Sequence, residues 1–216
     1  MLKKIFNSRK NNIQYHLIHR LLENKYGHKL SRDLKSPVDA NGNEIPWFTY
    51  PAFEFINQFD LTQKTIFEWG SGNSSVYFAK RCKQIISVEH DDAWFAKQKS
   101  KLLPNQQLFH LNDKSYYEAI LNFNQLFDII IVDGILRDDC LALAMNKISE
   151  GGMLILDNAD RHSESCKKYR ENGFTQIDFH GLGPVNEYAW TTSILFKTLM
   201  FNPISSQPVI PIGGGY

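Results

Sequence analysis

Short apolar runs and stretches with helical spacing alternate along this chain from about residue 64 to residue 197. Five apolar runs of strand length are each followed by a helical stretch, and two more runs follow with no helix between them. The predicted strands cover residues 65–69, 84–89, 107–111, 127–134, 151–158, 174–179 and 190–196. The predicted helices cover residues 74–82, 92–102, 114–121, 137–148 and 163–173.

Strands that alternate with helices predict βαβ units and a mainly parallel sheet with helices on both faces. The unbroken apolar run from Ile129 to Val132 is typical of a strand that is buried on both sides. The last two strands are joined by a loop, which predicts an antiparallel end. The pattern therefore predicts an α/β fold, a Rossmann-like doubly wound sheet of seven strands that is mainly parallel, with an antiparallel terminal strand.

The chain before residue 60 has a different pattern. Residues 13–26 have helical spacing and predict a helix whose Ile13, Leu17, Leu21 and Leu22 pack inward. Residues 36–55 contain three prolines and an Asn41-Gly42 turn signal, so they predict a linker that leads to a short helix at about 52–59. We expect a helical, lid-like extension over residues 1–60, a catalytic domain over 61–200 and a loosely held tail over 201–216.

Four aromatic residues in the linker have two possible roles, namely Trp47, Phe48, Tyr50 and Phe53. They either cover a ligand or close the edge of the core, and the sequence favours neither role.

Length and composition place the protein among soluble globular chains. The 216 residues suffice for one well-cored domain with an appendage. No run approaches the roughly 18 to 20 apolar residues that span a bilayer, and the first residues do not form a secretory signal. Cys82, Cys140 and Cys166 are far apart and lack metal or redox spacing, which indicates reduced cysteines in a cytoplasmic protein.

Charge is unevenly distributed. Residues 1–36 hold nine Lys/Arg and two Asp/Glu, a charge of +7, whereas the remainder holds 15 and 21, a charge of −6. A basic end could contact a membrane surface, an acidic partner or nucleic acid. The commoner explanation is the solvated face of a helix that caps the domain.

Acidic or amide side chains follow five consecutive predicted strands. Ligands of open α/β sheets bind beyond the carboxyl ends of the strands, so this repetition predicts a functional cluster. The residues at these strand ends are Glu68 to Ser75, Glu89-His90, Asn112-Asp113, Asp133-Gly134 and Asp157 to Asp160.

The stretch EWGSGNSS, residues 68–75, follows a strand and opens a helix. Gly70 and Gly72 permit a tight turn and a close approach of backbone to a ligand. Glu89 ends the next strand, at about the separation in sequence from the glycine loop at which a carboxylate binds ribose hydroxyls. Ser75 stands where a dinucleotide loop has its third glycine, and the Gly-Lys-Ser/Thr of a phosphate loop is absent.

These residues resemble a known family. Glu68-x-Gly70-x-Gly72-x-Ser74 is similar to the first motif of class I S-adenosylmethionine-dependent methyltransferases, and more narrowly the chain resembles a group of small, mostly uncharacterised bacterial methyltransferases. The resemblance implies S-adenosylmethionine as cofactor and an antiparallel last strand. It also implies a role for each matching residue. Glu68, Gly70, Gly72 and Ser74 would hold the amino acid end, Glu89 with His90 the ribose, Asn112 or Asp113 the adenine, and Asp133 the methionine end or the acceptor.

Two arrangements could take a proton from a hydroxyl acceptor. Asp133, Asp157 and Asn158 resemble the Asp…Asp-Asn triad of cation-dependent O-methyltransferases, and three oxygen ligands suit Mg²⁺. The Lys that is common shortly after the first Asp is absent, and the alternative is that Asp157 and Asn158 only shape a loop.

The second arrangement is a side-chain base, His162 or His180, each of which follows a strand. Arg137 and Arg161 either hold an anionic acceptor or are surface charges. We therefore predict Asp133, Asp157 and His162 as the catalytic residues.

The acceptor class can be narrowed. The chain lacks the Asn/Asp-Pro-Pro-aromatic signature of nucleic-acid amino methylation and a Pro-Cys pair for cytosine methylation, and its catalytic part is acidic. We expect O-methylation of a small-molecule or sugar acceptor, with nucleic acid disfavoured. Two alternatives stay open, another transfer from the same cofactor such as aminopropyl transfer, and a non-catalytic binding subunit.

Overall fold

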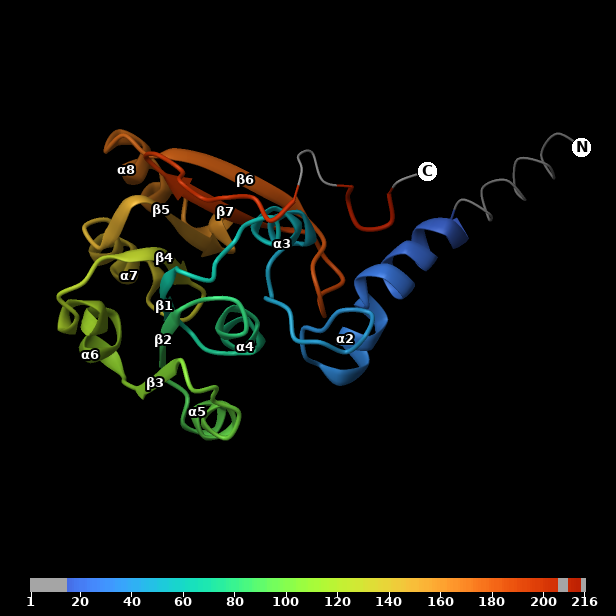
Figure 1. Ribbon diagram of the computed structural model, residues 1–216, viewed down its shortest axis with the longest axis horizontal. Helices are drawn as coiled ribbons and strands as arrows, with labels where there is room; N and C mark the ends of the chain where they lie inside the picture. The colour runs from blue at the N-terminus through green and yellow to red at the C-terminus, as the bar shows by residue number, and fades with distance from the viewer. Residues whose placement is uncertain (1–14, 206–209, 215–216) are drawn as a thin grey trace, which may run out of the picture.

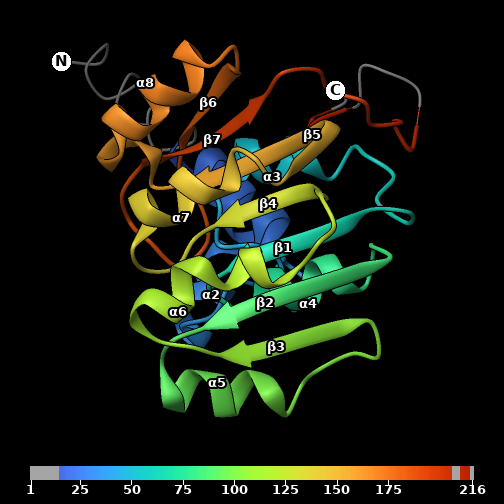
Figure 2. The ribbon, with the colours of Figure 1, turned by 90° about the vertical axis from the view of Figure 1, so that its left-hand side faces the viewer.

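The computed structural model describes residues 15–205 and 210–214, and within them the chain forms one seven-stranded sheet. The strand order is β3-β2-β1-β4-β5-β7-β6 (Figures 1 and 2). The strands are β1 (Thr65–Trp69), β2 (Gln84–Glu89), β3 (Gln106–His110), β4 (Phe127–Val132), β5 (Ile148–Asp157), β6 (Thr175–Gly181) and β7 (Trp190–Phe196). The first five strands pair in parallel, and β7 is antiparallel to both β5 and β6. The predicted sheet, including its antiparallel end, is confirmed.

Helices cover both faces of the sheet, as Figure 2 shows for α6 and α7 in front and α4 behind. They are α4 (Asn73–Ala79), α5 (Asp92–Lys99), α6 (Asp113–Tyr117), η2 (Glu118–Asn122), α7 (Arg137–Ala144), η3 (Ala159–Arg161) and α8 (Ser163–Glu171). The predicted helix over 114–121 is interrupted, since α6 passes into the 3₁₀ turn η2 at Glu118. Asp91 caps α5, since its side chain accepts a hydrogen bond from Trp94 N at 2.7 Å.

The core consists of two layers because successive side chains of a strand point to opposite faces. In β4, Ile130 and Val132 pack in one cluster with α6, α7 and α8, whereas Ile129 and Ile131 pack in the other with α4. All four side chains are fully buried, as the unbroken apolar run predicts.

The N-terminal segment contains more structure than predicted. Residues 15–21 are helical and continue into the π-helix η1 (Leu22–Tyr26), and a further helix α2 (His28–Leu34) follows Gly27. Gly27 has φ +73°, and a Cβ there would meet the Asp39 carbonyl carbon at 2.3 Å. The sharp turn between η1 and α2 therefore depends on glycine.

The prediction that the first helix packs inward is wrong at Leu17, whose side chain is 59% exposed. Helical residues 15–20 project from the body of the molecule (Figure 1), and all six are exposed. Leu21 and Leu22 are partly buried, and Ile13 lies outside the described residues. None of the helices in the described part is long and apolar enough to cross a membrane.

The linker aromatics divide between the two roles that the sequence left open. Phe48, Tyr50 and Phe53 are buried in the same cluster as α3 (Tyr50–Ile56), whereas Trp47 lines a cavity. The predicted turn at Asn41-Gly42 is present, since Gly42 has φ +84° and its N–H donates to the Asp39 carbonyl at 3.1 Å.

Candidate functional site

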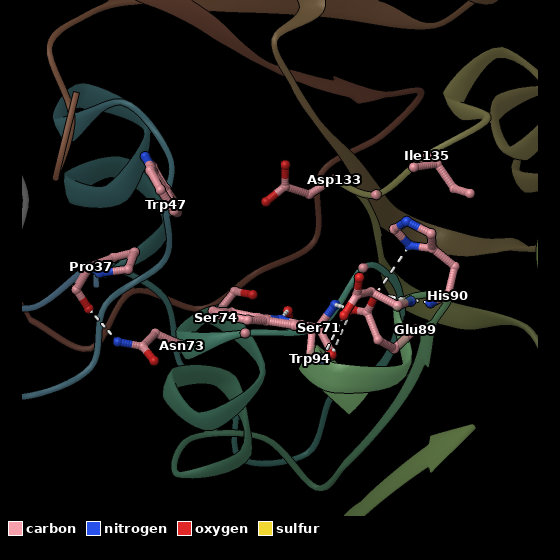
Figure 3. Close-up of a pocket in the computed structure, with 14 residues that line it drawn as sticks. Pro37, Trp47, Ser71, Asn73, Ser74, Glu89, His90, Trp94, Asp133 and Ile135 are labelled. Atoms are coloured by element: carbon pink, nitrogen blue, oxygen red, sulfur yellow. Dashed lines mark hydrogen bonds and ion pairs between the residues drawn. The ribbon is translucent and has the colours of Figure 1, made fainter. Parts of the chain in front are cut away.

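A cavity of about 470 Å³ lies beyond the carboxyl ends of β1, β2 and β4 (Figure 3). The strand ends supply one wall, and Pro37 and Trp47 of the N-terminal segment supply the opposite wall. Fourteen residues line the cavity, namely Pro37, Trp47, Gly70 to Ser74, Glu89 to Asp91, Trp94 and Asp133 to Ile135. Such a position and volume fit a small-molecule site, for which about 300–1,000 Å³ is usual.

The loops after β1 and β4 touch at their glycines. Gly70 has φ +94°, and a Cβ on it would lie 3.0 Å from the Gly134 N atom and 3.1 Å from the Asp133 carbonyl carbon. A Cβ on Gly134 would lie 1.8 Å from the hydroxyl oxygen of Tyr116, which is buried without a hydrogen-bond partner. The predicted close approach of backbone at Gly70 is therefore an approach to another loop of the same protein.

Glu68 lies beneath the glycine loop and does not line the cavity. Its carboxylate is fully buried and accepts hydrogen bonds from the hydroxyls of Ser74, Ser75 and Ser87, at 2.6, 2.5 and 2.7 Å. Burial raises the pKa of Glu68 to about 7, against the opposing effect of the three hydroxyls. We expected Glu68 to hold the cofactor directly, but in this structure it holds Ser74 and Ser75 at the start of α4.

Glu89 lines the cavity, and both of its carboxylate oxygens are already hydrogen-bonded. Oε2 accepts from Ser71 N at 3.0 Å and Ser71 Oγ at 2.9 Å, while Oε1 accepts from the N–H groups of His90 and Asp91 at 2.9 and 3.0 Å. The ring nitrogen Nδ1 of His90 lies 3.1 Å from Oε1 (Figure 3). Glu89 therefore joins the glycine loop to the turn that begins α5.

Asp133, Asp157 and Asn158 come together, as predicted, at the adjacent ends of β4 and β5. The guanidinium of Arg137 lies between them, 3.1 Å from Asp133 Oδ1 and 3.1 Å from Asn158 Oδ1. Burial raises the pKa of Asp133 well above its usual value, and the nearby Asp157 carboxylate raises it further, whereas Arg137 opposes both effects. Burial also raises the pKa of Asp157 to about 6, opposed by hydrogen bonds from Thr192 and Trp190.

The predicted histidines lie away from this cavity. His162 Nδ1 is 3.1 Å from Asp138 Oδ1, and His180 Nδ1 is 2.7 Å from Thr191 Oγ1 beside a separate hollow between α8 and β6. Neither residue lines the cavity that Asp133 enters. The interpretation of His162 or His180 as the base therefore has no support in the geometry, because each was placed only by its position after a strand.

Asn112 and Asp113 are exposed at the end of β3 and do not line the cavity either. Sequence reasoning missed four lining residues, Pro37, Asp91, Trp94 and Ile135. Only Trp94 could have been found from the sequence, because Asp91 caps α5 and thereby fixes the position of the residue three places later. In the structure the indole N–H of Trp94 donates to Ser71 O at 2.5 Å. Pro37 is brought in by a tertiary contact, since Asn73 Nδ2 donates to its carbonyl at 2.7 Å.

No known protein-family profile matches the chain, and no curated protein sequence matches it. Solved structures do resemble it. An rRNA methylase from Streptococcus thermophilus has a TM-score of 0.53 and 14% identity, with 69% of this chain and 97% of that chain covered. A methyltransferase candidate from Streptococcus mutans, solved in complex with SAH, has a TM-score of 0.51 and 14% identity, with 65% and 93% covered.

A third structure, precorrin-6y C5,15-methyltransferase from Geobacter metallireducens, has a TM-score of 0.51 and 13% identity, with 65% of this chain and 82% of that chain covered. At these identities the likeness establishes the fold. The chain has the Rossmann-like fold of class I S-adenosylmethionine-dependent methyltransferases, which confirms the resemblance read from residues 68–74 at the level of architecture.

Proposed function

We propose that this protein is an S-adenosylmethionine-dependent methyltransferase that acts on a small-molecule or sugar acceptor, preferably at a hydroxyl. The observation that carries the proposal is the charge of the cavity. Its lining includes the carboxylates of Glu89, Asp91 and Asp133, and none of its fourteen described lining residues is Lys or Arg. S-adenosylmethionine carries a sulfonium and an ammonium group, and carboxylates in a sheltered cavity attract such a cation.

The fit to this cofactor extends to the individual groups. The backbone and hydroxyls of Gly70 to Ser74 are suited to its amino acid end, and Glu89 is suited to its ribose. Because Ser71 Oγ can rotate, a ribose hydroxyl can replace it as the donor to Glu89 Oε2. The assignment of Asn112 or Asp113 to the adenine rests on the family resemblance alone.

The acceptor is assigned to the space between Asp133 and the N-terminal wall. Asp133 points into the cavity from the end of β4, and Trp47 and Pro37 lie across from it (Figure 3). When bound, the cofactor supplies an electrophilic methyl group for in-line displacement. Of the three residues that we predict to be catalytic, Asp133 is the one that lines this cavity. Its carboxylate can therefore receive the proton of a hydroxyl acceptor there. Trp47 offers a flat apolar surface on which a sugar or an aromatic ring can lie.

The fold itself does not select the acceptor, because the similar structures include an rRNA methylase and a precorrin methyltransferase. The carboxylate lining favours a small acceptor, since a polyanion would bring phosphates towards Glu89, Asp91 and Asp133.

The first test is cofactor binding. We expect Glu89→Gln to weaken S-adenosylhomocysteine by roughly 10- to 100-fold in calorimetry, because hydrogen bonds to a charged group contribute about 1.5–3 kcal/mol. Asp92→Asn is the matched control, since Asp92 is an exposed carboxylate on the same turn and does not line the cavity. The 2′-deoxy analogue should lose less affinity on Glu89→Gln if Glu89 binds the ribose directly. Equal losses for both ligands would leave Glu89 as a residue that only positions the loop.

The second test separates the alternative functions. Incubation with S-adenosylmethionine and a panel of sugars and phenols should give a product heavier by one CH₂ group. A larger mass gain, in a parallel incubation with decarboxylated S-adenosylmethionine, would indicate aminopropyl transfer. Cofactor binding with no product from any acceptor would favour a binding subunit, and absence of cofactor binding by the wild type would refute the proposal.

A further inference from the structure

The guanidinium of Arg137 uses all five of its N–H donors on two neighbouring loops. Its Nε donates to Gly134 O at 2.8 Å, and Nη2 donates to both the carbonyl and Oδ1 of Asp133, each at 3.1 Å. Its Nη1 donates to Asn158 Oδ1 at 3.1 Å and, at short range, to the carbonyl of Asp157. A single side chain thus connects the loop after β4 to the loop after β5.

These acceptors include the oxygens that a divalent cation would need. A metal held by Asp133, Asp157 and Asn158 would have to bind Asn158 Oδ1, the only side-chain oxygen of that residue, and Arg137 already donates to it and to Asp133 Oδ1. The second carboxylate of the three residues is held from another direction, because Asp157 Oδ1 accepts from Trp190 Nε1 at 2.9 Å and Thr192 Oγ1 at 2.6 Å. Within the described residues, no group of three or more His, Cys, Asp or Glu side chains is arranged to hold a metal ion. The residues therefore do not fit the metal that the sequence suggested.

We propose that Arg137 takes the place of the divalent cation in this site, as a permanent organic cation that fixes Asp133, Asp157 and Asn158 relative to one another. A guanidinium stays protonated at all relevant pH values and offers donors in a rigid plane, so it neutralises the same carboxylates without leaving an open coordination position. The site then cannot chelate a diol acceptor as a metal would.

The same contacts remove the other role considered for Arg137. An arginine that binds an anionic acceptor needs donors directed at the acceptor, and none of the five is left over. Arg137 is thus a positioning residue for Asp133. Its side chain is only 15% exposed, so its removal leaves the buried Asp157 and the partly buried Asp133 close together without a cation.

The experiment needs no substrate, so its outcome does not depend on whether the proposed methyl transfer is right. Wild-type protein is titrated with Mn²⁺ and followed by electron paramagnetic resonance, and its melting temperature is measured with Mg²⁺ and with a chelator. We expect no saturable site that Asp133→Asn removes, and the same melting temperature in both conditions. Saturable Mn²⁺ binding that Asp133→Asn abolishes would overturn the proposal.

A second arm of the experiment removes the guanidinium of Arg137 and then supplies a guanidinium as a small molecule. Arg137→Ala should lower the melting temperature by roughly 5–15 °C, the range expected for breaking a buried ion pair in a chain of this size. Millimolar methylguanidinium should restore part of that loss in Arg137→Ala and have no such effect on the wild type. Arg161→Ala, which removes an exposed arginine near the end of the neighbouring β5, is the matched control and should melt as the wild type does.

The second arm contradicts the proposal if Arg137→Ala melts within the error of the wild type. It also contradicts the proposal if Mg²⁺ restores the variant as well as methylguanidinium does, because the site would then accept a metal equally well.

Discussion

At the residue scale, the glycine loop depends on a carboxylate that the cavity does not contain. Glu68 is fully buried, and its three hydroxyl partners come from α4 and β2. Burial disfavours the charged form of this carboxyl, which raises the pKa of Glu68 to about 7 from its ordinary value of 4.5. The charge of Glu68 therefore affects stability within a physiological range of pH.

We expect Glu68 to make the free energy of unfolding fall as pH rises from about 4.5 to about 7. A carboxyl whose pKa is raised in the folded state binds more protons folded than unfolded across that window, so deprotonation favours the unfolded state. The effect is up to about 3 kcal/mol, from roughly 1.4 kcal/mol per pKa unit. Urea unfolding at pH 5 and pH 8 should show a smaller pH dependence for Glu68→Gln than for wild type. Glu164→Gln changes an exposed carboxyl and serves as the control; equal pH dependence in all three proteins would refute the role of Glu68.

Some site residues follow from the sequence, and the reason is positional. Gly70, Glu89 and Asp133 stand at the carboxyl ends of predicted strands, and parallel strands bring these ends to one edge, where all three residues line the cavity. The direction of a side chain is not fixed in this way, and so Glu68 turned out to face inward. The contact of Arg137 with Asn158 depends on β4 and β5 being neighbours. No local sequence pattern predicts that β4 and β5 are neighbours.

At the element scale, the strands were predicted better than the N-terminal segment. Strands β1, β2 and β7 have the predicted bounds, and each is buried along its length except at one end residue. The first helix has apolar positions that suit packing, yet Leu17 and Ile18 are exposed. Helical periodicity shows which face is apolar but not whether another element covers it. Helix α2 was missed because its seven residues hold only two apolar side chains, both leucines.

We expect deletion of residues 1–36 to destabilise the protein and to weaken cofactor binding. The deletion removes the buried His28 and Ser31, and it removes Tyr26, whose ring centroid lies 4.4 Å from that of Tyr50. Leu22 and Tyr26 are also partly buried against the core, and at about 25 cal/mol per Å² of buried apolar surface their loss should amount to a few kcal/mol. The deletion also ends at Pro37, a wall of the cavity that Asn73 holds through its carbonyl.

The matched control is deletion of residues 1–20, because all its described residues, 15–20, are exposed. The melting temperature of both deletion variants is measured by circular dichroism, and their affinity for S-adenosylhomocysteine is measured by calorimetry. If the longer deletion melts like the full chain, the N-terminal segment does not cap the core.

At the scale of the whole molecule, the alternation of strands and helices determined the architecture, because a right-handed crossover rule leaves few ways to arrange βαβ units. The position of β7 between β5 and β6 was not predicted, since the pattern of residues 174–196 indicates an antiparallel pair without indicating which of the two strands joins the sheet. Charge is the other property of the whole chain, and it separates the basic N-terminal region from the acidic remainder.

The basic end coincides with an uncovered apolar surface, which leads to our last prediction. Tyr15, Leu17 and Ile18 are 73%, 59% and 60% exposed on the projecting helix, within a region of charge +7 (Figure 1). A helix that combines exposed apolar side chains with basic ones binds the surface of an anionic membrane, and each Lys or Arg near it contributes about 1 kcal/mol.

We expect the protein to sediment with phosphatidylglycerol vesicles and not with phosphatidylcholine vesicles. The bound fraction should fall as salt rises from about 0.1 M to about 1 M, where the Debye length shrinks from roughly 10 Å to 3 Å. The double variant Leu17→Glu and Ile18→Glu should lose most of the binding, whereas Leu34→Glu, an exposed leucine on α2, should not. If neutral vesicles bind the protein as well as anionic ones, charge is not what brings it to a membrane. If neither binds it, the basic region is the solvated surface of a capping segment.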